Sequence, residues 1–275
     1  MRYPTQLTMK KIFSLIIIFV ALSSHELFLK TDSYFLEPFQ TAELYLFNGT
    51  FDESENVITR DRIINDKVIG PNYQFAPGDD DYYDKDLQTY LKIRTGQSGT
   101  YVAGVSTLPR NIELSSEDFA AYLEHEGLSD VLSQREKLGI DDKAAVEKYS
   151  KHVKALLQAG EEPTEDYAKV LGYPIEFIPL ANPYRLTVGD QMSFQLLFDG
   201  KPLPNQVVHM SWREGPGAKA RDEMSRRTDE QGEFSFTIDA KGHWYVASIY
   251  MQESPEQGLD YESNWATLTF QIDQD

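Results

Sequence analysis

The chain has 275 residues, contains no cysteine and carries a formal net charge of −18 at pH 7. A chain this acidic repels nucleic acid and anionic lipid headgroups, so we expect neither a nucleic-acid partner nor a role at a membrane surface. The lack of cysteine excludes disulfide bridges and the acylated cysteine of a bacterial lipoprotein.

The first 24 residues have the order of a secretory signal peptide. Basic residues at positions 2, 10 and 11 precede an apolar run at 12–22, and small residues stand at 21, 23 and 24. The run is shorter than the roughly 20 residues that span a bilayer, which disfavours the alternative of an uncleaved anchor. We therefore predict that residues 1–24 are a signal peptide, cleaved near Ser23 or Ser24, and that the mature protein is periplasmic without direct membrane insertion.

Residues 25–114 have the alternation of strands. Apolar side chains recur at every second position in 42–46, 87–93 and 101–105, a pattern typical of antiparallel sheet. The stretch 49–86 between them is polar and rich in turn residues, so we predict a solvated loop region there. This part of the chain is expected to form an N-terminal β domain.

Residues 115–172 change to a helical period. Ser115 and Asp118 approximate a capping box, and Phe119, Tyr122 and Leu123 share one helical face before Gly127. A second helix is predicted within 141–160, where one face carries Val146, Tyr149, Val153, Leu156 and Leu157. We expect this segment to be a helical insert that belongs to the N-terminal domain.

Residues 173–275 return to short strands separated by turn dipeptides at regular intervals. At least five apolar or aromatic segments of this kind predict an antiparallel β-sandwich, with a domain boundary near 171–174. The expected fold is therefore mainly β, with two antiparallel sandwich-like domains, at 25–114 and 173–275, and the helical insert 115–172 between them.

Several segments, in this order along the chain, resemble an exported bacterial family of unknown function, domain of unknown function 4198. The segments are HELFLK, GTYVAGVSTLPRNIEL, FAAYLEHEGL, LGYPIEFIPLANPY, TDEQGEFSFTIDAKGHWYVAS and DYESNWATLTFQI. The resemblance implies an exported β protein whose C-terminal sandwich is immunoglobulin-like or transthyretin-like. Members are often labelled as periplasmic components of nickel or cobalt uptake, so it also implies a divalent transition metal ion as ligand and a membrane metal transporter or another cell-envelope protein as partner.

A transition-metal site in a chain without thiols needs imidazoles. Of the five histidines, His125 and His152 are predicted to be surface residues of helices. His209 and His243 are predicted on the strand faces opposite the sandwich core, where a plain polar surface role is the alternative. His25 differs, because cleavage after Ser24 would place an α-amine beside its imidazole and form a bidentate nitrogen chelate.

The hypothetical metal site therefore consists of His25, with Glu26, His209 and His243 as candidate partners. Two alternatives stay open: cleavage one residue earlier, which would leave Ser24 first, and a plain end-of-strand role for His25. The acidic segment 78–86 lacks the spacing of an EF-hand loop and is predicted to be solvated.

No motif for a catalytic nucleophile, a metalloprotease or a phosphate-binding loop is present, so we expect a binding protein and not an enzyme. The leading hypothesis is a periplasmic accessory protein that binds a nickel- or cobalt-class ion during metal uptake. The alternative is a structural module that docks an envelope protein or a glycan through aromatic residues: Tyr82, Tyr83, Trp244 or Tyr261.

Overall fold

The computed structural model describes residues 26–274, so the predicted signal segment 1–24 and His25 lie outside the described residues. The described chain is mainly β, as predicted. Within it the strands form three sheets, which we call the outer, central and small sheets. All pairings are antiparallel except those of one long strand with two of its neighbours.

The outer sheet contains β1 (Glu26–Lys30), β3 (Thr41–Gly49), β4 (Ser54–Asn56), β7 (Tyr82–Lys85) and β8 (Gln88–Arg94). The central sheet contains β2 (Phe35–Leu36), β5 (Ile63–Gly70), β6 (Tyr73–Phe75), β9 (Gly99–Thr107), β10 (Arg110–Leu114), β11 (Ala145–Ala159), β15 (Val207–Arg213), β16 (Met224–Arg227), β18 (Gly242–Glu253) and β19 (Tyr261–Ile272). The small sheet contains β12 (Ile175–Pro179), β13 (Gln191–Phe198), β14 (Lys201–Pro202) and β17 (Glu233–Thr237).

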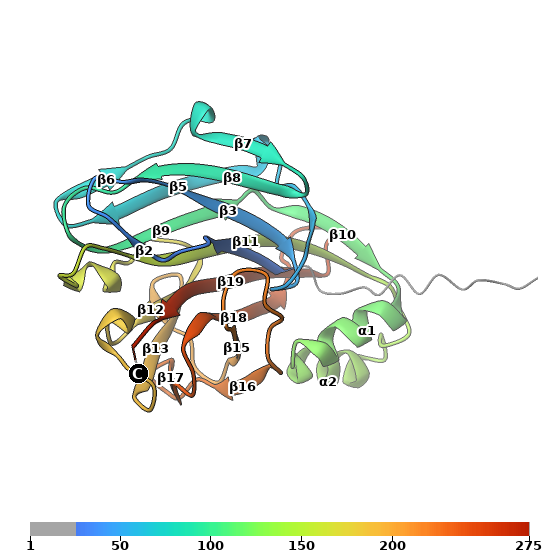
Figure 1. Ribbon diagram of the computed structural model, residues 1–275. Coiled ribbons are helices and arrows are strands. Elements are labelled where there is room, and N and C mark those ends of the chain that lie inside the picture. The colour runs from blue at the N-terminus through green and yellow to red at the C-terminus, as the bar shows by residue number, and fades with distance from the viewer. Residues whose placement is uncertain (1–25, 275) are drawn as a thin grey trace, which may run out of the picture.

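The long strands β11, β19 and β18 run through the middle of the molecule, with the outer sheet above them and the small sheet below in Figure 1. The two faces of β11 meet different neighbours. Lys154 pairs with Glu176 of β12, whereas Lys151, an odd number of residues away and so on the opposite face, interacts with Glu26 of β1. Because this part of the central sheet is covered on both faces, β11 is buried throughout its second half.

Strand β1 joins the outer sheet to the central sheet. It pairs with β3 on one edge, while its opposite edge has no strand partner among residues 26–274. There the carbonyl oxygens of Leu27 and Leu29 accept hydrogen bonds from the hydroxyls of Thr267 and Thr269 on β19, at 2.7 and 2.5 Å. The first described strand is thus attached to the last strand of the chain.

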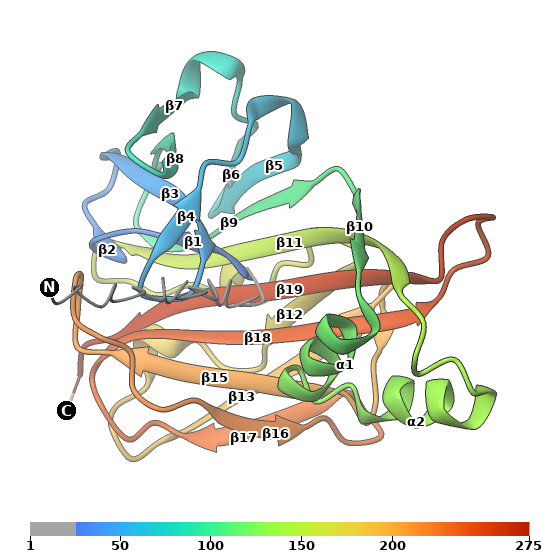
Figure 2. The same ribbon diagram turned by 90° about the vertical axis from the view of Figure 1, so that its right-hand side faces the viewer.

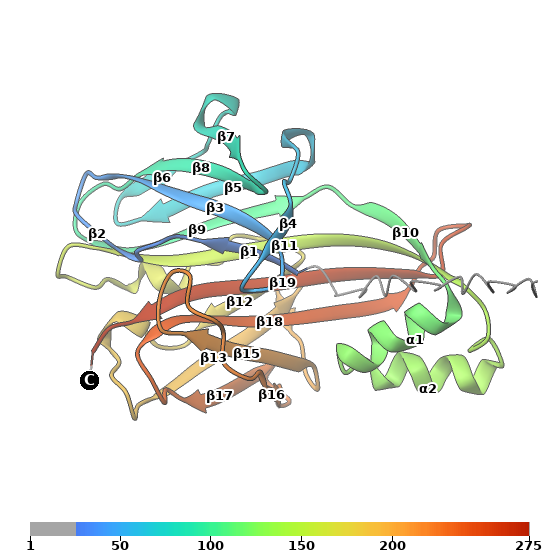
Figure 3. The same ribbon diagram turned by 45° about the vertical axis from the view of Figure 1, so that its right-hand side comes forward.

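The first predicted helix is confirmed, and the second is wrong. Helix α1 (Ser116–His125) is capped by Ser115, whose hydroxyl accepts the Asp118 amide hydrogen at 3.1 Å, and it buries Phe119 and Leu123. Helix α2 (Ser129–Leu138) follows, and both pack at one end of the central sheet (Figure 3). Residues 145–159, however, form β11, so the segment 115–172 contains no α-helix after α2.

The helical prediction failed at β11 because tertiary pairing overrides its local period. Antiparallel β9 and parallel β19 flank the strand, so side chains on both of its faces are buried and simple alternation disappears. The predicted loop 49–86 is wrong in part for a related reason, since it contains the short strands β4, β5, β6 and β7. Three short 3-10 helices lie at Arg60–Arg62, Asp79–Asp81 and Pro183–Arg185, and a fourth at Glu165–Ala168.

The chain turns between β11 and β12 around one buried carboxylate. Glu176 pairs with Lys154 at 3.0 Å, and its two oxygens accept the amide hydrogens of Leu171, Gly172 and Tyr173 at 2.8–3.2 Å. Both charged side chains are almost fully buried. This turn contains the predicted boundary at 171–174, while the central sheet itself continues from β11 to β19 across that point.

Candidate functional site

The described candidate residues lie on three strands that meet between the outer and central sheets. Glu26 opens β1, His209 lies in the middle of β15, and His243 stands near the start of β18. Figure 2 shows β1 crossing over the central sheet, with the helices at one end of it. The histidines of β15 and β18 point to the side that β1 covers, which is the face opposite the core residue Trp244.

The strand register separates His209 from His243. In the β15–β18 pair, His243 lies opposite Arg213, whereas His209 lies opposite Ala247. Four residues along a strand span about 13 Å, so the two histidines stand at opposite ends of this face. Two ligands of one metal ion, each bonded at about 2.1 Å, must lie within about 4 Å of each other. His209 and His243 therefore belong to different environments.

The end that contains His209 is acidic. We define the β1 head cluster as the ionisable residues that interact there, contributed by β1, the end of α1, β11, β15 and the residue preceding β16. They are Glu26, Glu126, Glu147, Lys151, His209 and Glu223.

A hydrogen bond between His209 and Glu223 organises one side of the β1 head cluster. The His209 Nδ1 atom lies 2.8 Å from a Glu223 carboxylate oxygen, and the Tyr245 hydroxyl donates to the other oxygen at 2.8 Å. Burial opposes charge on the imidazole, but the hydrogen bond and charge of Glu223, with Glu126 nearby, outweigh it and raise the pKa of His209. The same partners lower the pKa of Glu223 despite its own desolvation.

Two other carboxylates of the cluster, Glu26 and Glu147, are destabilised in their charged form. Burial, and then the negative charges of Glu126 and Glu223, raise the pKa of Glu26 well above its ordinary value. Burial also raises the pKa of Glu147, although Ser263 and Tyr122 donate hydrogen bonds to it. Four carboxylates thus share a site in which Lys151 and His209 are the basic members.

Lys151 compensates this negative charge only in part. Its ammonium group is buried, donates to the Asn48 side chain at 3.1 Å and lies 5.5 Å from the centre of the Trp265 ring. Burial, and then the charge of Arg62, lower the pKa of Lys151 to about 7, against the influence of Glu26 and Glu147. At neutral pH the Lys151 ammonium is therefore only partly charged.

The opposite end of the same face is basic. The buried Lys30 ammonium donates to the Phe51 carbonyl oxygen at 2.6 Å and lies 3.8 Å from the centre of the Phe47 ring, and burial lowers its pKa to about 6. His243 packs edge-on against Tyr34, and burial, followed by Arg213 and Lys30, lowers its pKa to about 4. A neutral imidazole among positive neighbours does not attract a cation.

Three carboxylates of the cluster were not predicted from the sequence: Glu126, Glu147 and Glu223. Glu147 lies in β11, which the sequence pattern assigned to a helix. Glu126 directly follows α1, where helical period gives no functional signal, and Glu223 belongs to the irregular segment 214–223 before β16. His152, predicted on a surface, is instead buried in β11, and its ring contacts Ser106, Ser150 and Asn264. His125 is exposed, as predicted.

Among residues 26–274, no three His, Asp or Glu side chains are arranged so that they could hold a metal ion. Nor is any helix within that range long and apolar enough to cross a membrane. Of the aromatic residues predicted to dock a partner, Trp244 and Tyr261 are buried in the core. Tyr82 and Tyr83 are partly exposed, and their hydroxyls donate to Asp66 and Glu43.

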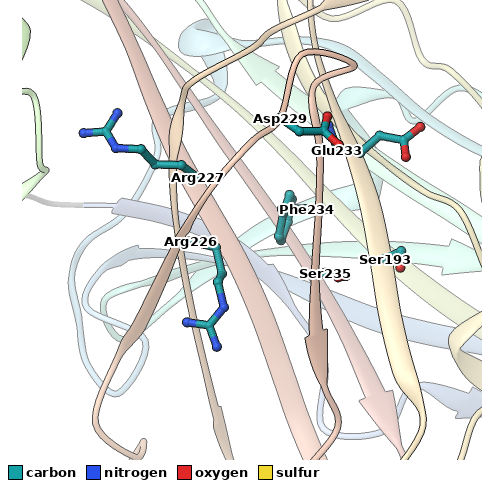
Figure 4. Close-up of a pocket in the computed structure, with 7 residues that line it drawn as sticks. All are labelled: Ser193, Arg226, Arg227, Asp229, Glu233, Phe234 and Ser235. Carbon is teal, nitrogen blue, oxygen red and sulfur yellow. The ribbon is translucent and has the colours of Figure 1, made fainter.

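A surface pocket of about 350 Å³ lies between the edges of the central and small sheets. It is lined by Ser193, Arg226, Arg227, Asp229, Glu233, Phe234 and Ser235. Figure 4 shows the two arginine side chains extending in different directions, away from the two carboxylates. The pocket therefore has charged walls without a convergent set of groups, unlike the β1 head cluster.

The described residues form a mainly β protein. Its first described strand, β1, contributes Glu26 to a buried cluster of carboxyl groups around the imidazole of His209. The chain belongs to the family described as "Domain of unknown function (DUF4198)", whose model matches residues 22–252. No curated protein matches the chain at a significant level.

Solved structures give only distant likenesses. One is dimeric latent PorU from Porphyromonas gingivalis, at 10% identity and a TM-score of 0.21, covering 90% of this chain and 20% of that one. Another is trypsin-activated alpha-2-macroglobulin from Escherichia coli, at 10% identity and a TM-score of 0.22, covering 90% and 15%. The D0-D1 domain of intimin has 10% identity and a TM-score of 0.21, covering 89% and 97%. The chain thus spans a fifth or less of the first two proteins, and at these TM-scores none of the likenesses informs function.

Proposed function

We propose that this protein is an exported, non-enzymatic accessory protein that binds a divalent transition metal ion of the nickel and cobalt class during metal uptake. In this proposal residues 1–24 direct export, the mature chain acts in the periplasm, and its partner is a membrane metal transporter or another cell-envelope protein. The observation that supports the proposal is the gathering of carboxyl groups around an imidazole at the β1 head cluster, where His209 Nδ1 lies 2.8 Å from Glu223.

The β1 head cluster contains the donor types that such an ion prefers, an imidazole and several carboxylates. When a histidine binds a metal through one ring nitrogen, the N–H of its other ring nitrogen usually donates a hydrogen bond to a carboxylate. This hydrogen bond fixes the tautomer of the imidazole. His209 has this second contact, because Nδ1 faces Glu223 at 2.8 Å. Its Nε2 lies 3.5 Å from the Glu126 carbonyl oxygen, which can only accept a hydrogen bond, so Nε2 must give up its proton and turn away from that oxygen to bind an ion.

The metal ligands we propose are His25, which lies outside the described residues, and its partners His209, Glu26 and Glu126, whose side chains are not arranged in the described structure to hold an ion by themselves. His25 is placed by covalent adjacency alone, since it directly precedes Glu26. Imidazole nitrogen combined with carboxylate oxygen suits divalent nickel, cobalt, zinc and copper. His243 is not among the ligands, because the strand register puts it at the basic end of the face.

We also propose that the chain comprises two sandwich-like units of the immunoglobulin or transthyretin-like kind that share the central sheet. The outer sheet over β11, β9 and β5 would form the first unit, and the small sheet over β15, β18 and β19 the second. Contacts of β1 and β12 with opposite faces of β11 support this division. Helices α1 and α2 would then be the insert between the two units.

The test is a calorimetric titration of nickel, cobalt, copper and zinc into protein processed by its own signal peptide, with the N-terminus read by intact mass. We expect stoichiometric binding at micromolar affinity or tighter. His209→Ala and His25→Ala should each weaken it roughly tenfold or more, because each removes a nitrogen ligand. Glu26→Gln should weaken it as well, because an amide cannot ionise to supply the carboxylate oxygen ligand.

Two variants serve as matched controls. Glu262→Gln removes a half-buried carboxylate of β19 that pairs with Lys148, and His243→Gln removes the imidazole at the basic end. Both should bind metal like the wild type, once circular dichroism shows that they are folded. If none of the four ions binds to the wild type, the metal proposal is wrong, and the interaction-module alternative gains support.

A further inference from the structure

Three basic side chains lie buried together on the sheet face that β1 covers, at the end away from the β1 head cluster. They are Lys30 of β1, Arg213 of β15 and His243 of β18, exposed by 1, 4 and 2%, and we call them the basic cluster. Arg213 lies directly opposite His243 in the strand register, where Cβ atoms on one face are about 5 Å apart. The Lys30 ammonium and the Arg213 guanidinium carbon lie 4.4 and 5.0 Å from the centre of the same ring, that of Phe51.

The basic cluster has buried hydrogen-bond groups that nothing in residues 26–274 satisfies. The Nε atom of Arg213 and the Nδ1 atom of His243 are both buried without a hydrogen-bond partner. Arg213 also forms no ion pair within that range, although its guanidinium group is always charged. Burying a charge or a polar group without a partner is costly, so the basic cluster lacks a group that would accept from it.

Two carboxylates act on the basic cluster from a distance, and neither supplies that group. The exposed Asp32 accepts a hydrogen bond from the Tyr45 hydroxyl at 3.1 Å, and the half-buried Asp52 accepts one from the Ala220 amide at 2.9 Å. Burial and then the neighbouring guanidinium lower the pKa of Lys30 by more than these two carboxylates raise it. The unsatisfied donors therefore belong to the buried side of the basic cluster.

The donors of the basic cluster are of the kinds that bind oxyanions. A guanidinium group presents N–H donors in a planar fork that matches the oxygens of carboxylate and phosphate. A neutral imidazole can carry its hydrogen on Nδ1, where it serves as a further donor. One bound oxyanion would thus accept from the orphaned atoms of Arg213 and His243 and provide the missing counter-charge.

Two loop segments cover the basic cluster. Phe51 belongs to the turn between β3 and β4, and segment 214–223 begins directly after Arg213. Ala220 packs on the aromatic group that contains Phe51, and its amide donates to Asp52 of the same turn. Irregular segments of this kind open at a lower cost in free energy than paired strands, so they provide an entry path for a small ion.

We propose that the basic cluster is a binding site for a small oxyanion, held between the guanidinium group of Arg213 and the imidazole of His243, with Lys30 as a third donor. The site is separate from the proposed metal site and does not depend on it. The negative charge of the bound ion favours the protonated forms of Lys30 and His243. Anion binding is therefore coupled to the uptake of protons.

The experiment titrates inorganic phosphate into the metal-free, processed protein at pH 7, with chloride keeping the ionic strength constant. Calorimetry in two buffers of different ionisation enthalpy gives the dissociation constant and the number of protons taken up. We expect one phosphate per chain with a dissociation constant below about 1 mM. Protons should be taken up because the pKa values of Lys30 and His243, about 6 and about 4 without the anion, rise beside it.

Arg213→Met should weaken phosphate binding at least about tenfold, because it removes the charged fork. His243→Leu should weaken binding as well and reduce the proton uptake. Arg226→Met removes an exposed arginine of β16 and is the matched control, which should bind phosphate like the wild type. Sulfate and acetate, titrated in the same way, distinguish a preference for tetrahedral oxyanions from one for carboxylates.

The proposal is wrong if phosphate, sulfate and acetate all fail to bind at millimolar concentration. Equal affinity in Arg213→Met and the wild type would also refute it, since binding would then lie elsewhere. Nuclear magnetic resonance of the His243 imidazole in the wild type decides the matter even where Arg213→Met does not fold. An unchanged His243 pKa at saturating phosphate contradicts the proposal, and a raised one supports it.

Discussion

Replacing Glu176 with glutamine is expected to lower the free energy of unfolding by about 3–5 kcal/mol, because it leaves a buried ammonium group without its counter-charge. The carboxylate accepts hydrogen bonds from Lys154 and from three consecutive amides, those of Leu171, Gly172 and Tyr173. A glutamine side chain turns one acceptor oxygen into an NH₂ group, which then faces other donors. Urea unfolding at pH 7 measures the loss.

Glu256→Gln provides the control, since Glu256 pairs with Lys148 on the surface at a similar distance of 2.7 Å. Exposed pairs contribute roughly 0–1 kcal/mol, so this variant should unfold almost like the wild type. A loss of less than about 1 kcal/mol in Glu176→Gln would contradict the importance of the buried pair. Partial recovery in Lys154→Met/Glu176→Met would show that the cost lies in the stranded charge.

Acidification from pH 6.5 to pH 4 is expected to destabilise the protein through its buried histidine in β11. Burial lowers the pKa of His152 to about 4, below the ordinary value of 6.5. Between these values the unfolded state binds the proton and the folded state does not, so this contribution to stability is complete above pH 6.5 and is lost as the pH falls. The pKa difference corresponds to roughly 3 kcal/mol. His243, whose pKa is also about 4, acts in the same direction.

Other groups titrate as well, and the raised pKa values of Glu26 and Glu147 act in the opposite direction. The measurement is therefore a difference between urea unfolding curves of the wild type and His152→Gln, taken at several pH values with a chelator present. The variant should gain roughly 3 kcal/mol relative to the wild type as the pH falls from 6.5 to 4. An exposed change, His125→Gln, should follow the wild type throughout. Parallel curves for His152→Gln would refute the prediction.

The C-terminal strands could be predicted from sequence because each is short, alternates in polarity and is bounded by turn residues. β13, β15, β17, β18 and β19 all fall where the pattern places them. β11 could not be predicted, since its residues Val146, Tyr149 and Val153 also fit a helical stripe. Only the pairing with β19, more than a hundred residues later, decides its conformation. Two lysines, Lys151 and Lys154, added to the error by suggesting an exposed face where both are buried.

Only some residues of the β1 head cluster could be predicted from the sequence. The sequence indicated Glu26 and His209 through their chemistry, and the structure brings both to the β1 head cluster. It also indicated His243, which differs from His209 only in its position along the strand register. Glu126 and Glu223 carry no local signal, because their proximity arises from the packing of α1 and segment 214–223 against β15. The local pattern of polar and apolar residues does not predict which residues of different sheets lie close together.

The attachment of β1 to β19 has a consequence for how the protein matures. The carbonyl oxygens of Leu27 and Leu29 find their donors on threonines 240 residues later, so the first described strand cannot be fully secured until nearly the whole chain has emerged. Contacts this distant in sequence slow folding and leave early intermediates with exposed strand edges. A truncated or stalled chain would thus lack the packing that brings Glu26 to its partners. The proposed metal binding would then be confined to completed molecules.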